Sequence, residues 1–264
     1  MRGEAAQAFV YNPVPLAIPG LIRLLADSDR GVRLIAAEAL SAIRDRQAVP
    51  ALMKALDEIH QDHALATGNE QVFGVFARAL GEIGDANAVP ALQRALKRAG
   101  MLGGIHSGDR HALEAAIVHA LTRLGDRETA GEYWADCLPS EEAARGLATV
   151  GNAKHLRRLT GELATVAHDT KEHPPDPNEL FTCSDWRLGL TRSLLLAVEG
   201  VLARDAAGAS VEDLRAVALL PDGLRFLETY NVILDWDELR EVTVDCGGAK
   251  HMAVKELVRR GQTA

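Results

Sequence analysis

The sequence predicts an all-α fold, a right-handed α-solenoid of about five to six helix pairs. One observation is a recurring segment: GEIGDANAVPAL at 81–92 repeats SAIRDRQAVPAL at 41–52 and returns in part as TRLGDRETAGEY at 122–133. A spaced recurrence of this kind marks a repeat array. The other is composition, because hydrophobic residues make up 47% of the chain and aromatic residues only 4%. A core of Ala, Leu, Val and Ile suits closely packed helices better than a sheet.

An apolar stripe with helical spacing precedes each recurring segment. Its positions follow i, i+3, i+4, i+7, i+8 and i+11, the pattern of one buried helix face. The stripe residues are Val32, Ile35, Ala36, Ala39, Leu40 and Ile43; Val72, Val75, Phe76, Ala79, Leu80 and Ile83; and Leu113, Ala116, Ile117, Ala120, Leu121 and Leu124. Three long amphipathic helices are therefore expected at these places.

The stripes end in similar joints. Gly84 and Gly125 permit the left-handed turn that ends a helix, and an aspartate then caps the next one. The capping residues are Asp45, Asp85 and Asp126. Pro50 and Pro90 sit early in the following helices, where few backbone donors are needed.

These residues carry a family resemblance. The unit resembles the HEAT-like repeats first recognised in phycobilisome lyases, in which a short A helix beginning near Ala-Val-Pro-x-Leu precedes a B helix ending near Gly-x-x-Gly-Asp. The match is direct at Ala48–Leu52, Ala88–Leu92 and Gly81–Asp85, and Ala17–Leu21 is a variant. The resemblance covers residues 17 to about 128 and fades beyond Thr129.

We expect one solenoid domain over residues 1–264. An irregular lead of about sixteen residues precedes clear repeats at 17–128, where a first helix spans 17–26. Degenerate repeats follow at 129–208, with helices at 128–138, 141–150, 153–166 and 186–204 and a long insert at 167–185. Residues 209–264 form a C-terminal capping region, as expected of terminal repeats.

The capping region contains a helix followed by a segment with two alternative structures. Ser210 and Asp213 form a capping box for a helix that reaches Leu220. The β-branched alternation in TYNVILDW and REVTVD predicts a small β-hairpin near 228–245, and a helix over 235–242 is the alternative. A last helix is expected at 249–260.

Charge and cysteine usage limit the class of protein. The formal charge of −8 and the pI near 5.6 argue against a protein that mainly binds phosphate backbones. The N-terminal segment resembles neither a signal peptide nor a membrane anchor, so a cytoplasmic location is expected. Cys137, Cys183 and Cys246 suggest neither a disulfide framework nor a zinc site. No cofactor and no bound metal are expected.

Three of the repeats are lengthened at the same place. The added residues lie near 57–70, 99–110 and 167–185, and equivalent insertions emerge on one edge of a stacked array. This loop edge holds six histidines: His60, His63, His106, His111, His168 and His173. Imidazoles could bind zinc, but the sequence has no His-Glu-x-x-His or Cys-His pair at a rigid helical spacing. Polar surface loops are the simpler interpretation.

A solenoid generally binds partners on the concave face formed by its B helices. The candidate positions there are Arg33, Phe73 and Glu114, which align with one another, and Glu38, Arg78 and His119, which also align. Phe73 aligns with charged residues, so either it is a binding anchor or the lengthened loop of its own repeat covers it. An exposed Phe73 predicts that Phe73→Asp leaves folding intact and weakens partner binding.

The favoured function is a non-catalytic interaction or scaffold module that binds a protein partner on the concave face and loop edge. The sequence lacks G-x-S-x-G, P-loop and G-x-G-x-x-G motifs. The first alternative is a bilin lyase-like or other small-molecule-binding enzyme, which the resemblance implies. A HEAT-repeat DNA glycosylase is disfavoured by the acidity of the chain. A deoxyhypusine hydroxylase needs His-Glu dipeptides, which the sequence does not contain.

Overall fold

The computed structural model describes residues 2–57, 70–101, 107–172, 186–220, 223–230 and 238–262. Within these ranges the chain is helical except for one β-hairpin, and the predicted all-α solenoid class is confirmed. The chain divides into two compact units, Met1–Ala130 (unit 1) and Gly131–Ala264 (unit 2). The single domain predicted over residues 1–264 stays a prediction.

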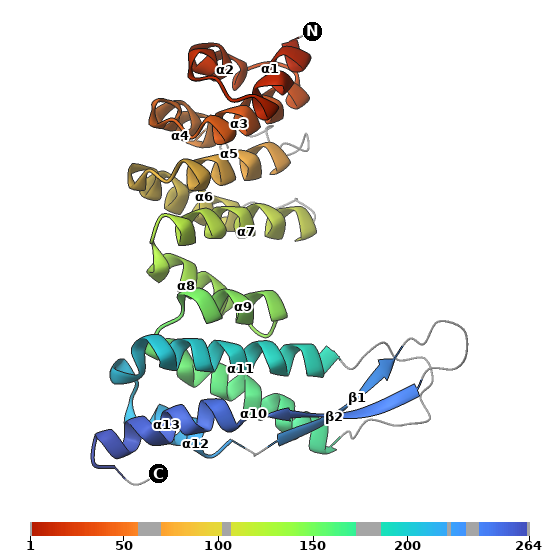
Figure 1. Cartoon of the computed structure of the whole chain (residues 1–264), viewed down its shortest axis with the longest axis vertical. Helices are drawn as coiled ribbons and strands as arrows, with labels where there is room; N and C mark the ends of the chain where they lie inside the picture. The colour runs from red at the N-terminus through yellow and green to blue at the C-terminus, as the bar shows by residue number, and fades with distance from the viewer. Residues whose placement is uncertain are drawn as a thin grey trace. The chain divides into compact units, whose positions relative to one another are not determined.

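Unit 1 consists of two layers of helices (Figure 1). The B layer contains α1 (Arg2–Tyr11), α3 (Arg30–Ile43), α5 (Glu70–Ile83) and α7 (Ser107–Arg123). The A layer contains α2 (Ile18–Leu24), α4 (Val49–Asp57) and α6 (Val89–Met101), preceded by the 3₁₀ turns η1 (Pro15–Ala17), η2 (Arg46–Ala48) and η4 (Ala86–Ala88). Successive B helices pack side by side, and each A helix packs against the B helix that follows it.

Small residues allow the B helices of unit 1 to lie close together. The predicted stripes are the buried faces, and Leu40, Leu80 and Leu121 are all fully buried. A Cβ atom on Gly81 of α5 would lie only 2.9 Å from the Cα atom of Ala120 on α7. The low aromatic content of the sequence therefore corresponds to a core of aliphatic and alanine side chains.

The N-terminal lead is helical, so the prediction of an irregular lead is wrong. Helix α1 packs along α3, with Ala6 buried and Gly3 facing Val32 and Ile35. The segment gave no helical signal because its apolar residues cluster without a regular stripe. Packing against α3 stabilises it as an additional B-layer helix.

Unit 2 repeats the two-layer arrangement. Helices α9 (Glu141–Val150), α11 (Trp186–Asp205) and α13 (Gly247–Arg259) pack in sequence, and α10 (Leu156–Glu172) and α12 (Val211–Ala218) form the other layer. The 3₁₀ turns η5 (Ala153–His155) and η6 (Ala206–Gly208) connect them, and α8 (Arg127–Asp136) crosses the boundary between the units. The predicted helices at 141–150, 186–204 and 249–260 are confirmed within two residues. Because α10 continues to Glu172, the expected insert is wrong over 167–172, and residues 173–185 lie outside the described ranges.

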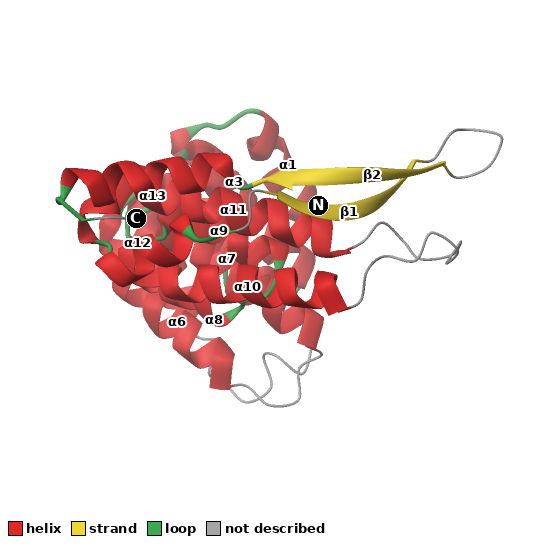
Figure 2. Cartoon of the chain, turned by 90° about the horizontal axis from the view of Figure 1, so that it is seen from below, coloured by secondary structure: helices red, strands yellow, loops and turns green. Residues whose placement is uncertain are grey.

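A β-hairpin of unit 2 joins α12 to α13 (Figure 2). Strands β1 (Gly223–Tyr230) and β2 (Glu238–Asp245) are antiparallel, in a register that runs from Gly223 opposite Asp245 to Tyr230 opposite Glu238. The predicted hairpin is confirmed, with its first strand beginning before residue 228. The alternative helix over 235–242 is wrong for residues 238–242, where the β-branched pattern forms a strand.

Among the helical residues that the structure describes, none forms a helix both long and apolar enough to cross a bilayer.

Candidate binding face

The joints between repeats fix where each B helix of unit 1 ends. Asp45 Oδ1 accepts a hydrogen bond from the Gln47 backbone N–H at 2.8 Å, and Asp85 Oδ1 accepts one from Asn87 at 3.0 Å. Asp126 Oδ1 accepts from the Thr129 backbone N–H at 3.2 Å. The predicted aspartate caps are therefore confirmed in all three joints.

A left-handed residue precedes each of these caps. Gly84 and Gly125 have φ values of 77° and 88°, as the glycines predicted. Arg44 occupies the equivalent place in the first joint and has a φ of 56°. Among the described residues other than glycine, Arg44 alone has a positive φ, a conformation that side chains with a Cβ atom adopt at a cost.

The first row of candidate residues is not exposed, which corrects the prediction. Phe73 is 6% exposed and its ring packs edge-to-face on Phe76, with the ring centroids 6.0 Å apart. Glu114 is 7% exposed, and Arg33 is half-buried with its Nη1 donating to the Asp27 carbonyl at 2.7 Å.

The burial of this row follows from helix geometry. Residues four positions later lie on the same side of each helix, and they are the fully buried Ala37, Ala77 and Val118. The apolar stripes are thus wider than six positions, and this row forms their flank. Phe73→Asp is now expected to disrupt the core, contrary to the prediction from sequence. Partner binding by Arg33, Phe73 and Glu114 remains untested.

The second row does lie on the surface. Arg78 and His119 are exposed and Glu38 is half-buried. Arg78 Nη2 lies 3.8 Å from Glu38 Oε1, so the row connects α3 and α5. The positions four residues before and after are also half-buried or exposed, which defines a continuous surface that we call the B face. Its residues are Leu34, Glu38, Ala42, Gly74, Arg78, Glu82, Ala115, His119 and Arg123.

The C-terminal end of the B face holds a charge cluster that spans three helices. Glu82 Oε2 accepts hydrogen bonds from Arg44 Nη2 at 2.9 Å and from Arg123 Nη2 at 3.0 Å. Arg123 also donates through Nε to the Gly81 carbonyl at 3.3 Å, near the end of α5. One carboxylate on α5 is therefore shared by arginines from the repeats before and after it.

The N-terminal ends of the same helices are also polar. Arg30 Nη2 donates to Gln71 Oε1 at 2.5 Å, which connects α3 to α5. On α7, Arg110 Nε and His111 Nδ1 lie 3.7 Å and 3.6 Å from the carboxylate of Glu114. Polar contacts therefore frame unit 1 at both ends of its B helices.

The loop edge is only partly described. His60, His63, His106 and His173 lie outside the described residues. His111 is exposed on α7 of unit 1, and His168 is exposed on α10 of unit 2. In the described ranges, no three His, Cys, Asp or Glu side chains are grouped so that they could hold a metal ion.

The A helices are joined by ion pairs. In unit 1, burial raises the pKa of Asp57, but hydrogen bonds from Arg94 at 3.0 Å and Arg98 at 2.9 Å outweigh it and lower the pKa. In unit 2, a hydrogen bond from Lys154 holds the pKa of Glu132 below its usual value. The contacts of Asp57 join the A helices α4 and α6, and the contact of Glu132 joins α8 to the 3₁₀ turn η5.

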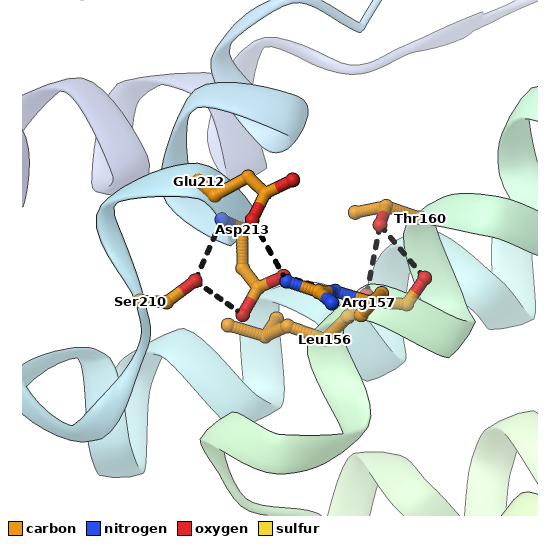
Figure 3. Close-up of polar contacts among 6 residues, drawn as sticks. All are labelled: Leu156, Arg157, Thr160, Ser210, Glu212 and Asp213. Carbon is orange, nitrogen blue, oxygen red and sulfur yellow. Dashed lines mark hydrogen bonds and ion pairs between the residues drawn. The ribbon is translucent and has the colours of Figure 1, made fainter.

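Figure 3 shows a further contact of this kind, between α10 and α12. Arg157 donates to Asp213 Oδ1 at 3.1 Å and to Glu212 Oε2 at 3.0 Å. Ser210 caps α12 by accepting from the Asp213 backbone N–H at 3.0 Å, as predicted. The hydrogen bond to Asp213, followed by the charge of Glu212, raises the pKa of Arg157. The arrangement is a helix-to-helix contact in which each polar group already has a structural role.

In unit 2, arginines at the C-terminal ends of α11 and α13 make similar contacts. Arg204 Nη1 donates to the Ala148 carbonyl at 2.6 Å, and Arg260 Nη2 donates to the Ala206 carbonyl at 2.7 Å. Arg259 and Arg260 hydrogen-bond the Glu256 carboxylate and lower its pKa to about 2. Arg204 thus satisfies a carbonyl group in the last turn of α9, and Arg260 satisfies one in η6, which follows α11.

Sequence reasoning missed the cluster of Arg44, Glu82 and Arg123. The recurring segment contained the necessary signal, because Arg44 stands where the other copies have glycine. Glu82 and Arg123 are equivalent positions of neighbouring repeats with opposite charge. The contacts of Glu82 with Arg44 and Arg123 depend on how the B helices pack side by side, which the sequence pattern of one repeat does not specify.

Comparison with known protein families confirms the repeat type. A model of HEAT repeats matches residues 1–67, and a model of the PBS lyase HEAT-like repeat matches residues 75–98. The chain thus carries HEAT-like repeats, as its sequence predicted. No curated protein matches the chain.

Solved structures of several helical proteins are similar to this chain. One is the complex of CpcE and CpcF of phycocyanin lyase from Nostoc sp. PCC7120, with 22% identity and a TM-score of 0.39 over 83% of this chain and 72% of that chain. Two are engineered proteins. Their identities are 18% and 16%, their TM-scores are 0.45 and 0.43, and the matches cover 99% and 93% of this chain and 65% and 98% of theirs.

Proposed function

We propose that the chain is a non-catalytic interaction module that binds a protein partner on the B face of unit 1. The observation that supports this is the surface itself, on which equivalent positions of α3, α5 and α7 are half-buried or exposed and are joined by polar contacts. A surface of this extent presents side chains of fixed spacing to an extended partner.

Site-specific photo-crosslinking tests this proposal in extracts of the native source. A photo-reactive residue replaces His119 on the B face, and a second variant carries it at Lys97, which is exposed on α6. We expect a discrete crosslinked protein from position 119 and none from position 97. Equal crosslinking from both positions, or none from position 119, would reject the B face as the binding surface.

The alternatives from the sequence remain predictions. The described residues contain no feature that favours a bilin lyase-like activity over an interaction module. A DNA glycosylase stays disfavoured because the chain has a formal charge of −8.

A further inference from the structure

We infer that the B face of unit 1, together with Arg44 at its C-terminal end, binds an acidic, amphipathic peptide segment whose carboxylates are held by Arg44, Arg78 and Arg123. This inference rests on the proposed function and specifies the chemistry of the partner. It follows from how the charges of the face are layered, from the small residues beside them, and from the backbone conformation of Arg44.

The cations of the face project further than its anions. The side chains of Arg44, Arg78 and Arg123 are 64%, 60% and 53% exposed. Glu82, which pairs with two of them, is only 23% exposed, and Glu38 is 42% exposed. A partner that approaches the face therefore meets guanidinium groups first.

The ion pairs with Glu82 leave guanidinium N–H donors available to a ligand. Arg44 and Arg123 share one oxygen of Glu82, so two positive charges face a single negative one. A guanidinium has five N–H donors, and in the described contacts Arg44 donates through Nη2 alone. Carboxylates of a partner can form charge-assisted hydrogen bonds with the outward edges of these groups.

The net negative charge of the chain lies mostly outside unit 1. Residues 131–264 contain 22 acidic and 15 basic residues, whereas residues 1–130 contain 15 acidic and 14 basic residues. Nearly all of the net charge of −8 thus belongs to unit 2, and unit 1 is close to neutral. Unit 1 therefore carries no large net negative charge that would repel an acidic partner.

An apolar row beside the arginines favours a peptide over a nucleic acid. The half-buried residues Leu34, Gly74 and Ala115 occupy equivalent positions on α3, α5 and α7, one turn before the charged row. Gly74, where an added Cβ atom would lie 3.6 Å from the Cβ atom of Ala116 on α7, and Ala115 add little side-chain bulk to this row. Cations next to an apolar row complement a segment in which acidic and apolar residues alternate in space.

The backbone of Arg44 is a separate indication of function. Its φ of 56° is the conformation that Gly84 and Gly125 adopt in the equivalent joints. Glycine would form this turn without the steric cost that a Cβ atom brings. A strained arginine in the place of a glycine is understandable if its side chain serves binding.

The test is fluorescence anisotropy with the full chain and a labelled peptide of about twelve residues that combines Glu and Leu. A matched peptide has Gln in place of Glu, and a single-stranded oligonucleotide of similar length is the other probe. At about 50 mM salt, we expect the Glu peptide to bind at least about tenfold more tightly than either. Tighter binding of the oligonucleotide, or equal binding of the two peptides, would overturn the inference.

Substitutions locate the site. R44G, R78Q and R123Q should each weaken binding of the Glu peptide about three- to tenfold. The matched controls are R94Q on α6 and R145Q on α9, whose arginines are ion-paired and similarly exposed but lie outside the B face. Binding that the controls reduce as much as the B-face variants would overturn the assignment.

The crosslinking experiment separates this inference from the proposed function. If position 119 captures a partner whose capture is unchanged in R78Q and R123Q, the B face binds protein but the acidic chemistry is wrong. If position 119 captures nothing and the Glu peptide does not bind, both the function and the inference are rejected.

Discussion

Arg44 is poorly suited to its left-handed backbone conformation, but its side chain is well placed to pair with Glu82. Its guanidinium contacts Glu82, but the pair is exposed, and exposed ion pairs add only about 0–1 kcal/mol. The left-handed conformation of its backbone costs a comparable or larger amount. The net contribution of Arg44 to folding is therefore expected to be unfavourable.

This balance predicts that Arg44→Gly stabilises the protein. The expected gain in the free energy of unfolding is small, up to about 1 kcal/mol, after subtraction of the lost surface pair and of the greater entropy of glycine in the unfolded chain. Urea denaturation followed by circular dichroism measures it. Arg46→Gly, two residues later in η2, is the control and should lose stability. A loss in Arg44→Gly as large as in the control would show that the turn is not strained.

Glu256 gives a prediction for the pH dependence of stability. Hydrogen bonds from Arg259 and Arg260 lower its pKa to about 2, whereas its ordinary value is 4.5. A depressed carboxylate pKa adds stability that is fully present above the unfolded value and is lost as the pH falls through the folded value. The contribution of Glu256 should therefore disappear between about pH 4.5 and 2.

Melting temperatures measured from pH 6 to about 2 test this dependence. Above pH 5 the wild type should melt higher than Glu256→Gln, and the difference should shrink as the pH falls toward 2. Glu212→Gln is the control, since Glu212 is an exposed carboxylate on α12 that pairs with a single arginine. A difference for Glu256→Gln that stays constant over the whole range would contradict the depressed pKa.

At the scale of the elements, the sequence predicted helices more surely than it predicted their faces. Strict stripes located α3, α5 and α7, and the Asp and Gly signals located the joints. The flank that contains Phe73 and Glu114 was misassigned, because a six-position stripe does not reveal that Ala77 and Val118 are buried as well. The width of a buried face depends on neighbouring helices, and one helix's own pattern does not contain that information.

Packing between α5 and α7 depends on one glycine. A Cβ atom on Gly81 would lie 2.9 Å from the Ala120 Cα atom, which is backbone and cannot rotate away. Gly81→Ala should therefore lower the free energy of unfolding by about 1–3 kcal/mol, as overpacking does. Chemical denaturation provides the measurement.

The matched control for this packing is Gly20→Ala in α2, where a Cβ atom would meet no atom within 4 Å. This variant should gain about 0.5–1 kcal/mol, because alanine is the better helix former. Equal effects of the two substitutions would show that helix propensity, and not the contact with Ala120, sets the cost at residue 81.

At the scale of the whole molecule, the chain consists of two compact units that share one construction principle. The sequence predicted this stacking of helix pairs from a short recurrence. The recurrence fades beyond Thr129, close to the boundary between the units at Ala130. The hairpin and α1 were harder to foresee. Helix α1 is stabilised by contacts with α3, and the hairpin pattern was balanced by a helical alternative.

A core substitution in unit 1 tests how far the units depend on each other. Phe73→Ala should cost about 3–5 kcal/mol, because it removes a buried ring from the core. Hydrogen exchange should then accelerate in α3, α5 and α7 and change little in α11 and α13. Uniform acceleration through both units would indicate one cooperative domain, as the sequence predicted.

The shared carboxylate of Glu82 also fixes the order of the repeats. The three equivalent helix ends carry plus, minus and plus charges, from Arg44, Glu82 and Arg123. Excision of residues 45–84 would remove one full repeat. It would bring Arg44 and Arg123 together without the carboxylate of Glu82 between them. The repeats are thus similar in fold but not interchangeable, because their order along the chain determines the surface ion pairs as well as the core packing.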